Sequence, residues 1–494
     1  MIEKKWIKVV PTPKRIKNTE KKVALLPFIR CEKKEWRELI VIFCECAKKI
    51  QNIPFSEGTG GVELCFDASL KEESYLLEIY TSSKENGVRV SASDYRGAAH
   101  GLASVLQLLD REYCIDECKI EDWPDKAYRG LMVDVARQWH PFRQLLHYVD
   151  LCFYFKVKYL HLHFMDDQSY TLPSVRFPKL SIPGRSYSAE QIAELRAYAK
   201  ARGVVLIPEI EMPGHARVLN QSYPESFSDQ WDDTLVKNTT GKTITENGEE
   251  ICADSTICAG SDKVFANVLT LIDETLELFP DSPYIHLGSD EVNHHVWEGC
   301  SHCVSYMKEH EIRDTKELYA DFIGRVTDYV LQKGRTPIVW EGFAAEHAER
   351  ISKDVIVISW ENHYQTADSL LRNGFQIINC AWKPLYIVGN INSSQTDRFC
   401  FWDILDWNVY EWKHFWKESA AWPNPLRVEP TEQVLGAQVC IWGLTYEHEI
   451  SRAVENIGAM SERVWNVTPI LDDKQILDHM QKVVPDVFRL IAEQ

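Results

Sequence analysis

The stretch Tyr-Ile-His-Leu-Gly-Ser-Asp-Glu-Val at residues 284–292 is a short apolar run that ends in two adjacent carboxylates, Asp290 and Glu291. Strands of a parallel β/α barrel present functional side chains in this way, because their carboxyl ends open onto loops around a pocket. Two carboxylates in one pocket cannot both ionise freely, so one of them can keep a proton near neutral pH. The dipeptide alone is equally typical of a solvated strand end, and the remaining sequence has to distinguish these interpretations.

The pattern from residue 127 onward is an alternation of short apolar runs and helical segments. The apolar runs lie at residues 128–135, 158–165, 204–210, 284–288, 336–340, 355–360, 375–380 and 436–442. Helical periodicity is present at residues 142–155, 189–202, 263–278, 315–332, 366–373 and 449–465. Eight β/α units predict an α/β protein with a closed (β/α)8 TIM barrel, whose active site lies at the carboxyl ends of the strands.

The first part of the chain has a different pattern, which predicts a small α+β domain before the barrel. Helical spacing at residues 35–49 and 94–109 brackets two alternating strands within residues 74–91. We therefore divide the chain into a non-catalytic α/β domain at residues 1–122 and a catalytic barrel at residues 123–494.

Two long polar stretches interrupt the β/α alternation. One covers residues 221–258 and the other, rich in Trp, covers residues 397–422. Loops of this length inside a compact domain are typically functional, so we expect the first to be a flap or insertion at the active site. The second is expected to be a further insertion of this kind.

Composition and charge limit the possible partners. The 494 residues are 45% hydrophobic and 26% charged, with a net charge of −18, which argues against a nucleic-acid partner. Residues 1–6 lack the apolar segment of a secretory signal, and the apolar run at residues 39–44 is far too short to span a membrane. The 14 cysteines have no framework spacing. These features predict a cytoplasmic protein without a membrane partner.

Polar and aromatic side chains follow the predicted strands at their carboxyl ends. They are Asp134, Arg137, Asp166, Asp167, Glu209, Glu211, His215, Asp290, Glu291, Trp340, Glu341, Trp360, Glu361, Tyr386 and Trp442. Because these strand ends meet on one rim, the side chains predict a pocket with aromatic walls and several titratable groups. Indole faces commonly bind the apolar faces of sugars, although each Trp alone is more often part of a core.

Five motifs in the barrel region occur in a specific order. They are Arg-Gly-Leu-Met-Val-Asp-Val-Ala-Arg (129–137), His-Leu-His-Phe-Met-Asp-Asp-Gln (161–168), Tyr-Ser-Ala-Glu-Gln (187–191), Ile-Pro-Glu-Ile-Glu-Met-Pro-Gly-His (207–215) and His-Leu-Gly-Ser-Asp-Glu (286–291). Together they resemble glycoside hydrolase family 20, and the resemblance runs from about residue 74 to residue 466. The segment before residue 122 is similar to the small domain that precedes the barrel in the exo-β-N-acetylhexosaminidases of this family.

The resemblance implies an exo-acting, retaining β-N-acetylhexosaminidase that releases terminal β-linked GlcNAc and/or GalNAc with no metal or other cofactor. In the substrate-assisted mechanism of this family, the 2-acetamido oxygen attacks its own anomeric carbon and forms an oxazolinium-like intermediate. Glu291 would be the general acid and then the base. Asp290 would orient the acetamide group and stabilise the developing positive charge. The partner would be an oligosaccharide or glycoconjugate with a terminal N-acetylhexosamine, and the oligomeric state stays open.

The resemblance also implies roles for residues around the two carboxylates. Asp166 and His215 would form a dyad behind Glu291 that helps to set its protonation. Arg137 would hold ring hydroxyls, because a guanidinium group suits two adjacent oxygens. The pocket walls would be Trp340, Trp360 and Trp442, with the hydroxyl of Tyr386 donating to the acetamide oxygen.

The sequence departs from the family pattern at several positions. Val388 stands where a carboxylate or amide is frequent, and residues 443–444 (Gly-Leu) replace the usual Glu after the last wall tryptophan. Glu447 or Glu449 could substitute for that residue. Glu211 stands where Asp is usual. These departures leave the gluco-versus-galacto preference open and admit a substituted sugar, such as a 6-sulfated one.

Alternative functions stay open on the residues alone. A metal-dependent amidohydrolase would use barrel side chains as ligands around an activated water, namely His161, His163, His215, His286 and Asp290. We instead expect the two histidines of the second strand to form supporting hydrogen bonds. A non-catalytic sugar-binding protein would keep the aromatic pocket without turnover. Arg137 alone could equally be a buried ion-pair partner of Asp134 or Asp166.

One further motif, Cys-Ser-His-Cys at residues 300–303, has the spacing of zinc ligands. A structural zinc site of the common type needs a second pair of ligands at a suitable distance, and the sequence offers none. We therefore expect free thiols on a loop.

Overall fold

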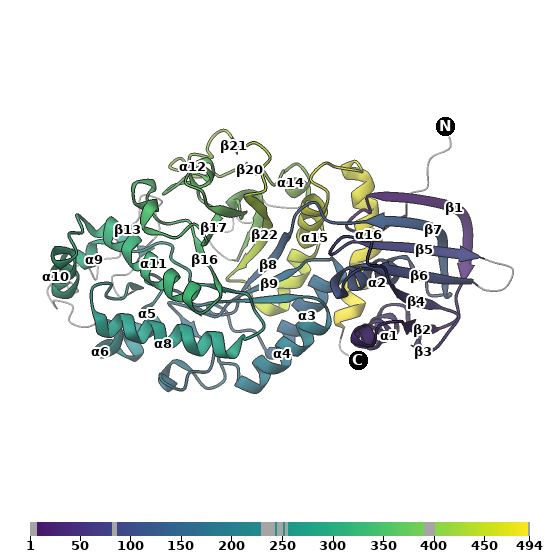
Figure 1. Cartoon of the computed structure of the whole chain (residues 1–494), viewed down its shortest axis with the longest axis horizontal. Coiled ribbons are helices and arrows are strands. Elements are labelled where there is room, and N and C mark those ends of the chain that lie inside the picture. The colour runs from purple at the N-terminus through teal and green to yellow at the C-terminus, as the bar shows by residue number, and fades with distance from the viewer. Residues whose placement is uncertain are drawn as a thin grey trace.

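The computed structural model describes residues 7–81, 86–228, 243–244, 250–251, 255–389 and 401–492. A barrel and a smaller sheet lie side by side, with the helix α16 (Asp473–Ile491) between them (Figure 1). The barrel strands follow the order β18-β17-β16-β15-β12-β9-β8-β22, and β18 pairs with β22 to close the ring. The predicted TIM barrel with a preceding small domain is therefore confirmed.

The barrel strands coincide with the predicted apolar runs. They are β8 (Tyr128–Asp134), β9 (Tyr159–His163), β12 (Val205–Glu209), β15 (Tyr284–His286), β16 (Thr336–Trp340), β17 (Ile356–Ser359), β18 (Gln376–Asn379) and β22 (Val434–Trp442). All seven residues of β8 are buried, as expected for a parallel strand covered on both faces. Side chains such as Met132, Ile207, Ile338 and Ile358 fill the interior of the barrel.

The outer helices also match the predicted segments. They are α3 (Phe142–Tyr154), α4 (Ala189–Ala201), α8 (Asp262–Leu278), α11 (Thr315–Gln332), α12 (Ala367–Arg372) and α15 (Tyr446–Trp465). Polar side chains satisfy the first backbone N–H groups of several helices. Ser188 begins α4 with a capping box that includes Gln191, and Asp314 caps α11 by accepting from the Glu317 N–H.

The smaller sheet has seven strands in the order β1-β7-β5-β6-β4-β2-β3. Their bounds are β1 (Arg15–Ala24), β2 (Phe28–Cys31), β3 (Ser56–Glu57), β4 (Val62–Phe66), β5 (Tyr75–Thr81), β6 (Asn86–Ala92) and β7 (Cys114–Asp122). Two helices, α1 (Arg37–Gln51) and α2 (Tyr95–Leu108), lie between this sheet and the barrel, where α1 contacts α16 and α2 contacts α3 (Figure 1). The last strand ends at the predicted domain boundary, and the division itself stays a prediction.

A buried polar network joins the smaller sheet to the barrel. Asp122 accepts hydrogen bonds from the hydroxyl of Tyr75 at 2.8 Å and from the indole N–H of Trp465 at 2.8 Å. The ammonium group of Lys156 lies 3.2 Å from the same carboxylate, and neither charged side chain is exposed. Burial lowers the pKa of Lys156, and the charge of Asp122 opposes that effect. One carboxylate therefore binds groups from both parts of the chain.

The two predicted insertions are described in part. The first contains α6 (Pro224–Phe227) and the short strands β13 (Thr243–Ile244) and β14 (Glu250–Ile251). The second contains α14 (Phe401–Leu405) and β20 (Glu411–Trp412), which pairs with β21 (Leu426–Arg427). The rest of the first insertion up to residue 254, and residues 397–400 of the second, lie outside the described residues, so the predicted flap stays a prediction.

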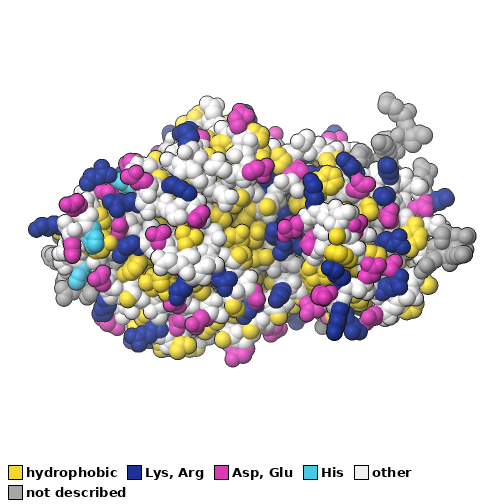
Figure 2. All heavy atoms as spheres, viewed as in Figure 1, with side chains coloured by type: hydrophobic (Ala, Val, Ile, Leu, Met, Phe, Trp, Pro, Cys, Tyr) yellow, Lys and Arg dark blue, Asp and Glu magenta, His cyan; other side chains and the backbone are white. Residues whose placement is uncertain are grey.

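The surface carries charges of both signs. Figure 2 shows basic side chains scattered among acidic ones over this face rather than gathered in one region. Within the part of the chain that the structure describes, no helix combines the length and the apolar character that a membrane crossing needs.

Candidate active site

The turn after β15 carries the two carboxylates. The strand ends at His286, and Gly288, Ser289 and Glu291 then adopt φ angles of 61°, 83° and 49°. A Cβ atom on Gly288 would lie 1.5 Å from an oxygen of Glu211, so glycine is required there. Glu211 also accepts the Ser289 N–H at 3.3 Å. This left-handed turn replaces the alternation of a strand, in which neighbouring side chains would point to opposite faces.

Asp290 and Glu291 approach one histidine. The Nε2 atom of His215 lies 3.0 Å from the Glu291 carboxylate and 3.8 Å from that of Asp290. The Nδ1 atom of the same ring lies 3.4 Å from Asp166. The structure therefore brings together all four residues that the sequence predicted as catalytic. Their roles remain proposals.

Burial and neighbouring charges shift the pKa values of this group. Burial raises the pKa of Asp290 to about 7; the charge of His215 opposes this effect and that of Glu291 adds to it. Burial alone would lower the pKa of His215, but the charge of Asp166 and hydrogen bonds to Asp166 and Glu291 outweigh it and raise this pKa well above 6.5. The site thus holds a cationic imidazole beside a carboxyl group that titrates near neutral pH.

Arg137 lies beside the dyad. Its guanidinium group is 2.8 Å from Asp166 and 3.8 Å from Asp134, and it lies over the ring of Trp442 at 4.7 Å from the centroid. Arg137 is therefore an ion-pair partner, as the alternative interpretation of this residue predicted. Its side chain keeps 29% exposure, so pairing does not bury it completely. Burial opposes the pKa shift of Asp166, but the charges of Arg137 and His215 hold that pKa well below its usual range.

The predicted wall residues form one aromatic cluster. The ring of Trp340 lies 6.0 Å from that of Trp360 and 6.0 Å from that of Trp442. Tyr386 stacks on Trp360 at 5.9 Å and lies 6.2 Å from Trp442. Residues at the carboxyl ends of strands β16, β17 and β22 and from the short strand β19 (Tyr386–Val388) thus meet in one cluster.

Trp382, in the region at residues 382–386 that the sequence places at the end of the seventh strand, extends the aromatic cluster. Its indole stacks on Tyr386 at 4.8 Å and lies 5.1 Å from Phe415 and 6.0 Å from Trp416. Phe415 and Trp416 belong to the predicted second insertion, so that insertion contributes to the site. The high tryptophan content of the second insertion was the feature of the sequence that could have indicated this contribution.

Glu209 is a residue whose role the sequence did not reveal. Its carboxylate accepts the indole N–H of Trp340 at 2.6 Å. Three histidine rings surround it at 2.5, 3.1 and 2.8 Å: His163, His161 and His286. The strand register explains this arrangement, because Glu209 is paired with His163 on β9 and with His286 on β15.

This network bears on the amidohydrolase alternative. Three of its five predicted ligands direct ring nitrogens to the Glu209 carboxylate, whereas the ring nitrogens of His215 lie beside Asp166 and Glu291. His161 and His286 group with Glu209, and His163 groups with Glu209 and Glu211, with ligand atoms within 4.8 Å of one another in each group. The geometry fits the supporting hydrogen bonds that we expected of the second strand, and Glu209 thereby positions the Trp340 wall.

Two of the predicted site residues each have a buried polar atom with no hydrogen-bond partner within the described ranges. These atoms are Oδ1 of Asp290 and Nε1 of Trp442. Buried polar atoms are nearly always paired, so an unpaired acceptor and an unpaired donor beside the carboxylates indicate positions for polar groups of a ligand.

The residues at which the sequence departs from the family pattern lie in different surroundings. Glu449 is buried, with one carboxylate oxygen 2.6 Å from Nε2 of His140 and in contact with the hydroxyl of Tyr148. Glu447 is exposed at the start of α15. Val388 lies opposite Trp442 in the pairing of β19 with β22. Of the two predicted substitutes for the missing glutamate, Glu449 is thus bound to α3, and Glu447 is the one with a solvent-facing side chain.

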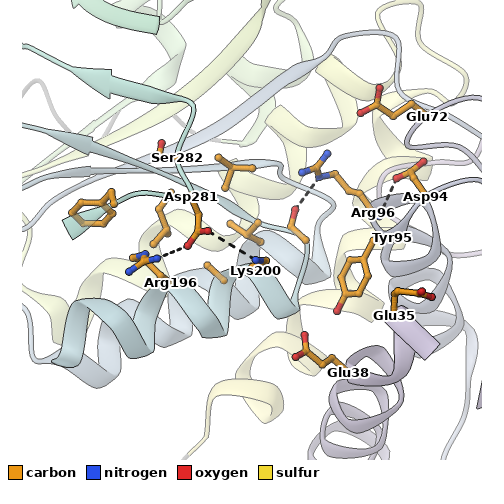
Figure 3. A pocket seen from close by; sticks show the side chains of 16 residues that line it. Glu35, Glu38, Glu72, Asp94, Tyr95, Arg96, Arg196, Lys200, Asp281 and Ser282 are labelled. Carbon is orange, nitrogen blue, oxygen red and sulfur yellow. Dashed lines mark hydrogen bonds and ion pairs between the residues drawn. The ribbon is translucent and has the colours of Figure 1, made fainter. Parts of the chain in front are cut away.

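A large cavity lies elsewhere in the molecule. It has a volume of about 610 Å³ and is lined by residues such as Glu38, Tyr95, Arg96 and Lys200, between the smaller sheet's helices and α4 (Figure 3). Val204 and Val205 place it at the amino end of β12. Functional residues of such barrels lie at the opposite ends of the strands, so this cavity is distinct from the candidate active site.

The fold and the site define the class to which the chain belongs: (β/α)8-barrel proteins with paired carboxylates and an aromatic wall at the strands' carboxyl ends. Residues 127–468 match the family described as glycosyl hydrolase family 20, catalytic domain. The chain belongs to this family, which confirms the resemblance drawn from the motifs.

Known relatives agree with this membership. A β-hexosaminidase of Vibrio furnissii is 27% identical over 349 residues, which cover 66% of this chain and 54% of the relative. One from Akkermansia muciniphila is 32% identical over 290 residues, covering 55% and 56%. The chain thus spans about half the length of these relatives. The exo-β-N-acetylglucosaminidase of Vibrio harveyi in complex with N-acetylglucosamine has the same fold, with a TM-score of 0.81, 21% identity and coverage of 98% and 77%.

Proposed function

We propose that the protein is an exo-acting, retaining β-N-acetylhexosaminidase that releases terminal β-linked GlcNAc and/or GalNAc. The observation that carries this proposal is the buried Asp290 Oδ1, which lacks a hydrogen-bond partner among the described residues beside Glu291. An acetamide N–H supplies the donor that this oxygen needs and brings with it the carbonyl oxygen that acts as the nucleophile, which the 2-hydroxyl of a plain sugar does not.

The reaction proceeds in two steps with one substrate-derived nucleophile. The acetamide oxygen forms a bond to the anomeric carbon while the bond to the leaving oxygen breaks, and Glu291 gives its proton to that oxygen. The N–H of the acetamide donates to Asp290, whose negative charge stabilises the positive charge of the oxazolinium ring. Water then attacks the anomeric carbon, Glu291 takes its proton, and the acetamide is restored with the β configuration.

His215 supports the change in charge of Glu291. After the first step Glu291 is a carboxylate, and the cationic imidazole 3.0 Å away stabilises that form. Asp166 keeps the imidazole charged and oriented, and Arg137 in turn binds Asp166. This support strengthens Glu291 as an acid toward the leaving group.

The aromatic cluster supplies the surface for the sugar ring. Trp340, Trp360, Trp442 and Tyr386 present apolar faces next to the carboxylates. In this proposal the Trp442 N–H and the Arg137 fork bind hydroxyl groups, and the Tyr386 hydroxyl donates to the acetamide oxygen. The N-acetylglucosamine bound to the Vibrio harveyi relative is of this substrate class.

The proposal extends to the organisation and location of the chain. Residues 123–494 carry the reaction, because every site residue comes from the barrel, and residues 1–122 are non-catalytic. A cytoplasmic location is part of the proposal and is supported by the free thiols of the described cysteines. The partner is a glycan or glycoconjugate with a terminal N-acetylhexosamine.

Rates on four aryl glycosides test the proposal: β-GlcNAc, β-GalNAc, 6-sulfo-β-GlcNAc and β-glucoside. We expect cleavage of one or more acetamido sugars and none of the glucoside, which has no acetamido nucleophile. NMR of the first-formed sugar should show the β anomer. Cleavage of the glucoside alone, or an inverted product, would contradict the proposal.

A further inference from the structure

Three thiols meet near the catalytic loops, and one of them, Cys258, lies 42 residues before Cys300 in the sequence. The Cys258 sulfur lies 3.4 Å from that of Cys300 and 3.6 Å from that of Cys303. Their exposures are 2%, 6% and 0%. The expectation of a lone Cys-x-x-Cys pair on a loop was therefore incomplete, because a single cysteine from before α8 joins the pair.

Backbone contacts fix this arrangement. Cys300 is the N-cap residue of α10 (Ser301–Glu309), and the loop before α8 lies directly against that helix end. A Cβ on Gly260 would lie 2.6 Å from Cα of Cys303, so only glycine allows this approach. The indole N–H of Trp297 donates to the carbonyl oxygen of Ile257 at 2.9 Å and holds the loop from the other side.

The distances suit a metal bound by thiolates. Zinc binds cysteine sulfur at about 2.3 Å, which for a tetrahedron places two sulfurs about 3.8 Å apart. The three sulfurs lie within 4.8 Å of one another, and two of the separations are 3.4 and 3.6 Å. Cys300 and Cys303 also have the Cys-x-x-Cys spacing of zinc ligands on a helix start.

We propose that Cys258, Cys300 and Cys303 bind a structural Zn²⁺ ion. Each thiol gives its proton to the solvent and binds as a thiolate, and a ligand beyond these three residues fills the fourth position. Cys380 and Cys440, whose sulfurs are 3.7 Å apart inside the barrel, form a pair without a third cysteine among the described residues and bind no zinc in this proposal.

The proposed zinc site is connected by hydrogen bonds to the two loops that carry the catalytic residues. Thr256, two residues before Cys258, accepts the backbone N–H of Asn293 at 3.3 Å. Ile257 donates its N–H to the carbonyl oxygen of Pro213 at 2.9 Å. These partners lie within two residues of Glu291 and His215, so an ion at the thiols would fix the positions of both catalytic loops.

Metal analysis of the full chain, purified under reducing conditions, tests the site without any assay of turnover. We expect about one zinc per chain in the unmodified protein, and a loss of at least about tenfold in Cys258→Ser, Cys300→Ser and Cys303→Ser. Cys152→Ser, which changes a fully buried thiol in α3, is the matched control and should keep its zinc. Folding of each variant is checked by circular dichroism.

Cobalt substitution of the unmodified chain keeps the test decisive if the serine variants fail to fold. Co²⁺ at the site should give sulfur-to-metal charge-transfer absorption and the visible bands of a tetrahedral ion. A purified protein with no zinc and no such spectrum would overturn the proposal, as would a Cys258 disulfide found by peptide mapping after alkylation. Because these readouts are independent of glycoside cleavage, failure here would leave the proposed function standing, and the reverse also holds.

Discussion

The imidazole of His215 connects Glu291 to Asp166: its Nε2 lies 3.0 Å from the first carboxylate and its Nδ1 lies 3.4 Å from the second. The ring is thereby fixed at both nitrogens. A proton on each nitrogen satisfies both contacts, in agreement with the raised pKa of this histidine. Glu291 is therefore linked to Asp166 through a residue 76 positions earlier in the chain.

Glu291→Gln should lower kcat on aryl β-GlcNAc by roughly 10²–10⁴-fold, because the amide cannot donate or accept the reacting proton. Steady-state kinetics measure the effect. The loss should be smaller for an aryl leaving group of low pKa, which needs little protonation. Equal losses for good and poor leaving groups would contradict the role of Glu291 as general acid.

Asp290→Asn should lower kcat by roughly 10²–10³-fold, since a neutral amide cannot stabilise the cationic intermediate. Asn is the matched substitution, because it preserves size and removes only the charge. The measurement is kcat on aryl β-GlcNAc in both proteins. A near-normal rate in Asp290→Asn would rule out the substrate-assisted mechanism.

The pH dependence of kcat/KM should show an acidic limb near pH 7. Asp290 must be anionic to act, and burial raises its pKa to about 7, so activity falls as the pH drops through that value. The profile between pH 4 and 9 measures this. The limb should disappear in Asp290→Asn, and its persistence there at the same pH would assign it to another group.

His215→Asn should lower kcat and shift the pH profile, because the charge of His215 opposes the rise in the pKa of Asp290, and its loss raises that pKa further. The acidic limb, where Asp290 gains a proton, should therefore move to higher pH. A fall in rate with an unmoved profile would indicate that His215 only maintains the fold of the loop.

Asp122→Asn should destabilise the protein by about 3–5 kcal/mol, because it leaves the buried ammonium group of Lys156 without its counter-charge. Denaturant unfolding measures the free energy. The penalty should shrink as the pH rises, since the pKa of Lys156 is lower in the folded than in the unfolded chain. Asp478→Asn, whose ion pair with Lys8 is exposed, is the control and should cost less than about 1 kcal/mol.

The barrel could be predicted from sequence because its strands are continuous apolar runs at regular intervals, and such runs are buried in every α/β barrel. The site residues could be predicted where a motif follows a strand, as at Asp290 and Glu291. Their common orientation could not, since it depends on a left-handed turn that is held by Glu211, a residue distant in sequence.

Other parts of the site depend on contacts between distant segments. The partners of Glu209 follow from strand register, which no local pattern specifies. Cys258 escaped notice for a similar reason: it lies 42 residues before Cys300, and its ligand-like position exists only after the loop packs on α10. In the sequence, the tryptophans of the pocket wall cannot be distinguished from tryptophans of the core, because only the closed barrel brings their side chains together.

The close fit between Gly288 and Glu211 has a consequence for engineering. The carboxyl group of Glu211 fills the volume that a side chain at position 288 would need, so these two positions are coupled in size. Replacing Glu211 with the shorter aspartate would leave a cavity under the turn. The backbone that orients Asp290 and Glu291 would then lose its support. Transfer of this pocket to another (β/α)8 barrel therefore requires Gly288 and Glu211 to be transferred together.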